Sequence, residues 1–264
     1  MSSSRNKIFL QVSNIIAFIS TVVVNILANT LPINGKTTAE ISDSYPNLFV
    51  PAGLTFSIWG VIYVLLGLFV VYQGRDIFKS QKEEMYFLDQ ISYLFLLSSA
   101  ANILWIFFWH YELVPLSLVA MLIILACLLA IYLRLNIGKN NSGMSRIEKF
   151  SIQIPFSVYL GWITVATIAN VTALLVSIEW DGFGISEAIW TIIILIVATV
   201  ITLLMLFIRK DIAYSLVIIW AFIGIIIKRL DPSLTSHIDI VITASIAVVI
   251  IIIGIIFIFI KKKR

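Results

Sequence analysis

Tryptophan, tyrosine and asparagine side chains recur at helical spacing inside several apolar stretches of this sequence. Trp59 is followed by Tyr63 one turn later, and Asn102 is followed by Trp105. Residues three, four, seven or eleven positions apart share one face of a helix. Aromatic rings beside amide groups suit a flat hydrophobic ligand that carries a few polar groups. The residues that we predict to line such a binding site are Trp59, Tyr63, Asn102, Trp105, Tyr159, Trp162 and Asn170.

The first apolar stretch carries polar residues along one side. Asn14, Thr21 and Asn25 follow helical spacing there, together with Phe18 and Asn29. Polar side chains are costly in lipid and normally face the interior of a helix bundle. We therefore expect several helices to turn a polar and aromatic face toward one shared interior. The alternative is that the Asn and Thr side chains only join helices by hydrogen bonds, while Trp and Tyr mark the membrane interface.

No group of residues in the sequence forms a catalytic constellation. The only histidines, His110 and His237, fall at predicted helix ends, and neither has a carboxylate or histidine four residues away. A zinc site on a helix needs such a partner. The only cysteine, Cys127, lies in an apolar run, so it has no partner for a disulfide or a metal site. We predict no cofactor and no metal, and leave open whether the protein is an enzyme.

The composition identifies the environment of these residues. Of 264 residues, 61% are hydrophobic and 12% are charged, and the mean hydropathy is +1.06. So few charges cannot cover a surface in water, which excludes a water-soluble enzyme, a disordered chain and a nucleic-acid reader. Apolar stretches of about 20 residues form membrane helices, because open backbone cannot face lipid. We predict an all-α polytopic membrane protein with about eight transmembrane helices, at 8–32, 53–73, 91–110, 114–133, 151–177, 188–208, 212–227 and 238–260, the seventh being the shortest.

The lysines and arginines predict the orientation of these helices. If the N-terminus is cytoplasmic, all of them except Lys36, Lys228 and Arg229 fall on the cytoplasmic side. This asymmetry is the one that membrane proteins show, and it explains the net charge of +4 without a nucleic-acid partner. We expect an integral protein of a bacterial cell membrane with both termini in the cytoplasm.

Two features divide the chain further. The stretches after residue 185 consist mainly of Ile, Val and Leu, whereas the earlier ones carry Asn, Ser, Thr and Trp. We therefore predict a five-helix functional module at 1–178 and an appended three-helix unit at 185–264. The segment 33–52 exceeds a simple connection and carries aromatics and prolines, which favours a lid over the bundle. The alternative is an exposed linker.

Three segments resemble motifs of the TspO/MBR family, the tryptophan-rich sensory proteins and the mitochondrial translocator protein. The second-helix W-x-x-x-Y pattern is similar to 51–63 (PAGLTFSIWGVIY), and the third-helix N-x-x-W pattern to 102–108 (NILWIFF). The fifth-helix Y-L-x-W-x-x-x-A-x-x-x-N pattern matches 159–170 (YLGWITVATIAN). The chain departs from the family where W-x-P-P is reduced to Val50-Pro51-Ala52, where Val158 replaces a proline, and in its three extra helices.

The resemblance implies a five-helix bundle that binds porphyrins, sterols or drug-like ligands under the first outer loop. The pocket tryptophans of the family would fall on Trp59 and Trp162. The predicted function is binding of a planar hydrophobic ligand, such as a tetrapyrrole or a sterol, for sensing or transport. Two alternatives stay open: a photochemical porphyrin-degrading enzyme with tryptophan as electron donor, and a ligand-free membrane assembly partner. The expected partners are the lipid bilayer and the porphyrin or sterol, with no nucleic acid, and a homodimer is left open.

Overall fold

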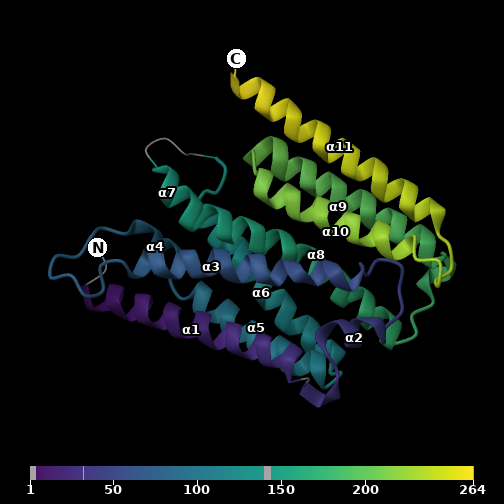
Figure 1. Ribbon diagram of the computed structural model, residues 1–264, viewed down its shortest axis with the longest axis horizontal. Coiled ribbons are helices and arrows are strands. Elements are labelled where there is room, and N and C mark those ends of the chain that lie inside the picture. The colour runs from purple at the N-terminus through teal and green to yellow at the C-terminus, as the bar shows by residue number, and fades with distance from the viewer. Residues whose placement is uncertain (1–3, 32, 140–143, 264) are drawn as a thin grey trace.

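Helices form at all eight predicted stretches in the computed structural model of the chain, which describes residues 4–31, 33–139 and 144–263. No strand occurs among these residues, so the all-α prediction is confirmed. Figure 1 shows the long helices running side by side in a layered bundle. They are α1 (Ser4–Thr30), α3 (Ile58–Gly74), α5 (Leu94–His110), α6 (Val114–Arg134), α8 (Ile154–Ser177), α9 (Glu187–Arg209), α10 (Ile212–Arg229) and α11 (Ile238–Lys263).

Short elements connect the long helices at both ends of the bundle. They are α2 (Thr38–Asp43), α4 (Tyr86–Ile91), α7 (Arg146–Glu148), the 3-10 turns Ile33–Gly35, Gly53–Ser57 and Gly182–Gly184, and a π-helical turn at Lys149–Gln153. A capping box starts α2, because the Thr37 side chain accepts from the backbone N–H of Glu40 while the Glu40 carboxylate accepts from Thr37 N–H. Capping side chains also start α9, at Ser186, and α10, at Asp211.

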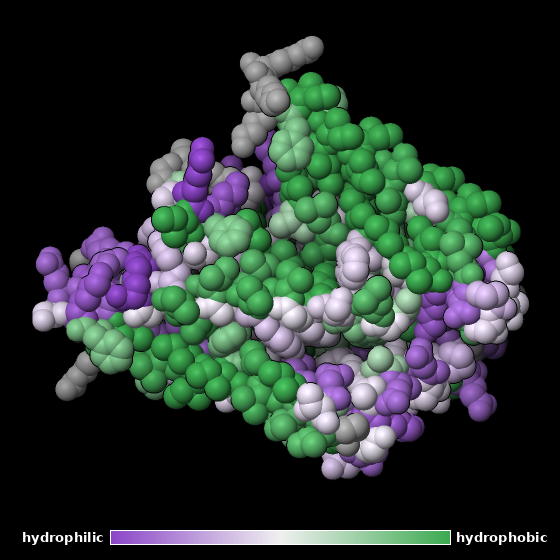
Figure 2. Space-filling model, viewed as in Figure 1, coloured by the Kyte–Doolittle hydropathy of each residue, from purple (hydrophilic) through white to green (hydrophobic). Residues whose placement is uncertain are grey.

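Among the residues that the structure describes, seven helical segments are long and apolar enough to cross a membrane. The shorter apolar helix is α5, with 17 residues. The predicted span 91–110 is shortened because Ser92 adopts a positive φ of 48°, which separates α4 from α5. The span predicted to be shortest, 212–227, instead continues to Arg229 and belongs to the seven. The hydrophobic surface in Figure 2 lies between hydrophilic groups at the left and lower right, as expected for an integral membrane protein.

Polar contacts gather the connecting segments at opposite ends of the bundle. Lys7, from the predicted cytoplasmic side, forms an ion pair with Asp76 of the next predicted cytoplasmic segment. On the other side, Lys228 Nζ lies 2.6 Å from Asp43 Oδ1. The two predicted sides are therefore two physical ends of the molecule. Which end faces the cytoplasm stays a prediction.

Asp76 is the buried centre of the first of these contacts. Its side chain is fully buried and accepts hydrogen bonds from Lys7, from Gln11 Nε2 at 2.8 Å and from the Glu83 backbone N–H at 2.8 Å. Burial alone would raise the pKa of Asp76, but these donors together outweigh burial and hold the pKa at about 2. The carboxylate therefore fastens the start of α1 to the end of α3.

The last three helices pack on one side of the other five. Figure 1 shows α9, α10 and α11 on the side of α8 that lies opposite α1 and α5. Gly161 permits close approach, because a Cβ atom added there would lie 3.1 Å from Val217 Cβ of α10. Trp220 of α10 also donates its indole N–H to the Thr55 carbonyl oxygen at 3.0 Å. Thus α10 contacts both α8 and the turn that leads into α3.

Candidate ligand-binding pocket

Four tryptophans from α3, α5 and α8 meet near the end of the bundle that carries α2. The Trp59 ring centroid lies 6.2 Å from that of Trp162, edge to face, and 6.5 Å from that of Trp105. Trp105 stacks on Trp109 with centroids 5.9 Å apart. Trp162 is 2% exposed, whereas Trp59 is half-buried. The indoles from three helices therefore face a common interior.

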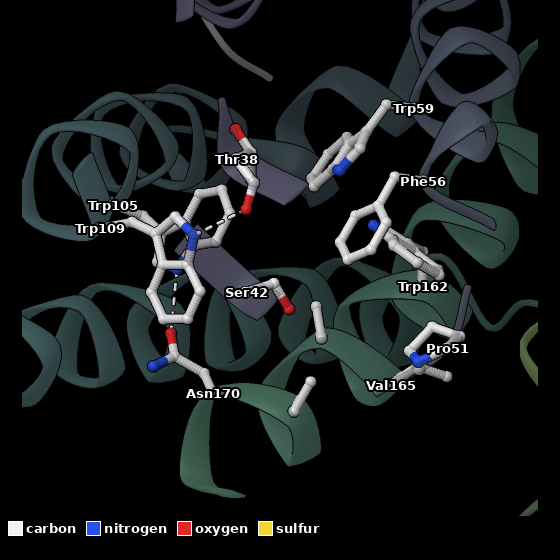
Figure 3. A pocket seen from close by; sticks show the side chains of 12 residues that line it. Thr38, Ser42, Pro51, Phe56, Trp59, Trp105, Trp109, Trp162, Val165 and Asn170 are labelled. Carbon is white, nitrogen blue, oxygen red and sulfur yellow. Dashed lines mark hydrogen bonds between the residues drawn. The ribbon is translucent and has the colours of Figure 1, made fainter. Parts of the chain in front are cut away.

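A small cavity lies between these rings and the segment that follows α1. Its volume is about 40 Å³, which is room for a few water molecules. Figure 3 shows Trp59, Phe56 and Trp162 on one side and the Trp105–Trp109 stack on the other. The segment 33–52 covers the cavity with α2 and Pro51. The lining residues are Thr38, Ser42, Pro51, Phe56, Trp59, Trp105, Trp109, Trp162, Val165, Ala166, Ala169 and Asn170.

Hydrogen bonds fix one wall of the cavity. The Trp105 indole N–H donates to Asn170 Oδ1 at 2.9 Å, and Asn170 Nδ2 donates to Ser117 Oγ at 2.9 Å. This chain ties α5 to α8 and α6. Trp109 donates to the backbone oxygen of Thr38 at 3.2 Å, which holds α2 in place. The dashed lines in Figure 3 mark the bonds of the two tryptophans.

A second polar chain lies beneath the cavity without lining it. Asn25 Nδ2 donates to Asn102 Oδ1 at 2.7 Å, and Asn102 Nδ2 donates to the Tyr159 hydroxyl at 3.2 Å. Tyr159 and Tyr63 contact the cavity only through Trp59, with ring centroids 6.1 Å and 5.7 Å from it. These residues support the Trp59 ring from below.

The structure thus separates the seven predicted site residues into two groups. Trp59, Trp105, Trp162 and Asn170 line the cavity. The other three, Tyr63, Asn102 and Tyr159, form a layer underneath it. On α1, Asn14, Thr21 and Asn25 are buried as the polar face predicts, whereas Asn29 is exposed.

Two buried polar atoms in the cavity wall lack a hydrogen-bond partner within the described part of the chain. They are Trp162 Nε1 and Thr38 Oγ1, which belong to two residues that line the cavity. A buried donor left unpaired costs about 1–3 kcal/mol. A ligand that offers an oxygen to these atoms would recover that free energy. The residues around the cavity therefore supply an aromatic wall and two unpaired polar atoms buried within it.

Several cavity residues lie outside the predicted set. Trp109 follows Trp105 by one helical turn, and this spacing is the signal that could have added it. Ala166 and Ala169 share the face of α8 that carries Trp162 and Asn170, and their small side chains leave room for the cavity. Thr38 has no comparable signal, because the sequence favours 33–52 as a lid but does not show which residue of that segment reaches the cavity.

The sequence matches a family model described as TSPO-like protein over residues 11–258. No curated protein and no solved structure matches the chain. The matched range covers nearly the whole chain and includes all twelve cavity residues as well as α10.

Proposed function

Because the chain belongs to the TSPO-like protein family, we propose that its aromatic cavity binds a planar hydrophobic ligand for sensing or transport. The family indicates a general ligand-binding or sensing role in a membrane. The observation that carries the proposal is that four tryptophans line one cavity. Two atoms of its lining residues, Trp162 Nε1 and Thr38 Oγ1, also have no hydrogen-bond partner among the described residues.

The wall defines the chemistry of the ligand. Flat indole faces favour a flat apolar ring system, and the Trp162 N–H requires an acceptor at its edge. The Thr38 hydroxyl can donate or accept. A tetrapyrrole with carboxylate groups satisfies both demands, and a sterol with one hydroxyl satisfies them in part. We therefore place the tetrapyrrole class first.

Binding such a ligand requires the cavity to open. Sites for drug-sized ligands measure roughly 300–1,000 Å³, against about 40 Å³ here. The element that covers the cavity is α2, which is held by the Trp109 bond to the Thr38 carbonyl, by the pair Lys228–Asp43 and by the buried side chain of Ile41. Asp43 is 61% exposed, and exposed ion pairs contribute about 0–1 kcal/mol. We propose that α2 swings away to admit the ligand and then closes over it.

A ligand-free assembly role is the second candidate, and the small cavity favours it. The chain from Asn25 through Asn102 to Tyr159 joins three helices by bonds between protein groups alone. Such bonds stabilise membrane helix bundles whether or not a ligand binds. In that role the tryptophans would be packing residues only.

We also propose a division of labour along the chain. Residues 1–178 form the ligand-binding module, and 185–264 form an appended unit that supports α8 and the Gly53–Ser57 turn through α10. Both termini would lie in the cytoplasm of a bacterial cell.

A protoporphyrin titration of the purified protein in detergent micelles tests the proposal. Tryptophan quenching in the dark should be saturable for the wild type. Trp162→Phe keeps one six-membered aromatic ring but removes the pyrrole ring with its N–H, so its affinity should fall by at least about two- to tenfold, the value of one hydrogen bond. Thr38→Val, which keeps the shape but removes the hydroxyl, should give a loss of similar size.

The matched control is Trp180→Phe, the same change in the loop after α8 and outside the cavity. Its affinity should equal that of the wild type. Absence of saturable quenching in the wild type would favour the ligand-free role. A product that forms only under light would favour the photochemical alternative.

A further inference from the structure

A second and larger groove lies between the five-helix bundle and the last three helices. Its volume is about 1220 Å³, above the roughly 300–1,000 Å³ of common small-molecule sites. One wall is α3 and α8, with Val61 and Val158; the floor is α10, with Leu216; the other wall is the end of α11, with Phe257. Figure 1 shows the C-terminal end of α11 diverging from α8.

Several apolar side chains along this groove are exposed on the surface of the protein. Val61, Leu216 and Phe257 are 54%, 54% and 55% exposed. Along α10 the groove extends from Ile212 to Trp220, which is roughly 12 Å at 1.5 Å per residue. One leaflet contributes about half of the roughly 30 Å hydrocarbon core. The groove therefore has the depth of one leaflet.

Four lysines surround one end of the groove. Lys139 follows α6, Lys149 begins the π-helical turn, Lys210 joins α9 to α10, and Lys261 lies near the end of α11. All four are exposed, and none forms an ion pair within residues 4–31, 33–139 and 144–263. Because they come from four separate segments, the tertiary fold is what gathers these charges.

Gln153 and Asp211 also line the groove. Gln153 is 3% exposed, and its Nε2 donor has no partner in the part of the chain that the structure describes. Asp211 is the only carboxylate among the described residues that line the groove. It already accepts from Ser157 Oγ at 2.6 Å, from the Tyr132 hydroxyl at 2.8 Å and from the Tyr214 N–H at 3.1 Å. Its charge is thus stabilised by neutral donors, while the lysines and Gln153 remain free to bind an anion.

We propose that this groove seats an anionic phospholipid of the bilayer, with its phosphate among the four lysines and one acyl chain along α10. Basic pockets between membrane helices bind lipid headgroups in this manner. The buried Gln153 amide would donate to an oxygen at the polar end of the lipid. The site is separate from the tryptophan cavity and does not rest on the proposed function.

Native mass spectrometry tests this proposal on the purified protein in micelles with equimolar phosphatidylglycerol and phosphatidylcholine of the same acyl chains. The wild type should retain phosphatidylglycerol preferentially, with one molecule per chain. The double variant Lys149→Gln with Lys210→Gln should bind phosphatidylglycerol about 30-fold more weakly, because each lysine near an anionic lipid contributes about 1 kcal/mol, or about fivefold in affinity. The control pair Lys79→Gln with Arg134→Gln removes the same charge at the same end, outside the groove, and should stay within about twofold of the wild type.

A second pair of variants separates a seated lipid from general surface attraction. Leu216→Trp should obstruct the groove and reduce retention of phosphatidylglycerol, although it leaves every lysine in place. Leu204→Trp, at a position of α9 that is 51% exposed and outside the groove, should not. Equal retention of both lipids by the wild type would overturn the proposal. The proposal would also be overturned if the control pair lost as much phosphatidylglycerol affinity as the Lys149→Gln and Lys210→Gln double variant. Unchanged retention of phosphatidylglycerol by Leu216→Trp would overturn it as well.

Discussion

Replacing Gly224 by alanine tests how tightly the last three helices hold the turn that leads to the tryptophan cavity. A Cβ atom at Gly224 would lie 2.0 Å from Thr55 Oγ1 and 2.9 Å from Thr55 Cβ. Rotation of the Thr55 side chain can move the hydroxyl but not its Cβ. The backbone of the turn must therefore retreat from α10, and it carries Phe56 and Trp59 with it.

The expected cost follows from these contacts. Overpacking of this kind costs about 1–3 kcal/mol. When the turn moves away from α10, two hydrogen bonds also weaken, each of which contributes about 0.5–1.5 kcal/mol. They run from the Ala52 N–H to the Gly224 carbonyl oxygen at 3.0 Å and from the Trp220 indole N–H to the Thr55 carbonyl oxygen at 3.0 Å. Alanine is favoured over glycine in a helix by about 1 kcal/mol. We expect a net destabilisation of about 1–3 kcal/mol.

Thermal unfolding in detergent micelles, followed by tryptophan fluorescence, measures this effect. The matched control is Gly60→Ala on α3, where an added Cβ would meet no atom within 4 Å, so that its stability should equal or exceed that of the wild type. Thr55→Ala removes the hydroxyl and methyl groups and should partly rescue Gly224→Ala. Protoporphyrin affinity should fall in Gly224→Ala as well, because Trp59 moves. Equal stabilities of the two alanine variants, with no rescue, would refute the close contact.

Three further predictions concern a buried carboxylate, a buried hydrogen bond and a close approach between two backbone segments. The pKa of Asp76 lies at about 2 in the folded protein instead of 3.8, so the ionised side chain should contribute roughly 2.4 kcal/mol to the free energy of unfolding. This contribution should be present above pH 4 and lost as the pH falls through 2. The unfolding temperatures of the wild type and Asp76→Asn should therefore converge at low pH, and a difference that stays constant with pH would contradict this. A double-mutant cycle of Trp105→Phe with Asn170→Ala should give a coupling free energy near 0.6 kcal/mol, the average for such bonds in membranes, and zero coupling would argue against the bond. Gly138→Ala should be more destabilising than Gly35→Ala. Both glycines have a positive φ, but of the two only Gly138 lies so close to another segment that an added Cβ atom would be 1.8 Å from a backbone carbonyl oxygen of α9. Equal unfolding temperatures of the two variants would count against this clash.

Much of the fold could be predicted from the sequence because local patterns decide it. Apolar runs of membrane length gave all eight helices, and the spacing of Asn102 and Trp105 placed both on the buried face of α5. The pairing of Trp59 with Trp162 across two helices also agrees with the helical periodicity of each segment. Exceptions are local as well: Ser92 interrupts a predicted span through its own backbone conformation.

Except at Asn29, which is exposed near the end of α1, the sequence by itself determined which of these polar and aromatic residues face the interior, because periodicity fixes the face of a helix. Only the tertiary structure decided which helices face each other and how closely. Thr55 and Trp220 form a hydrogen bond although 165 residues separate them, and no local pattern encodes such a pair. The tryptophan cavity is small for the same reason: its volume is the space left after side chains from α2, α3, α5 and α8 have packed, and a shift of one turn would fill or empty it. The four lysines of the second groove likewise become one site only where four distant segments meet.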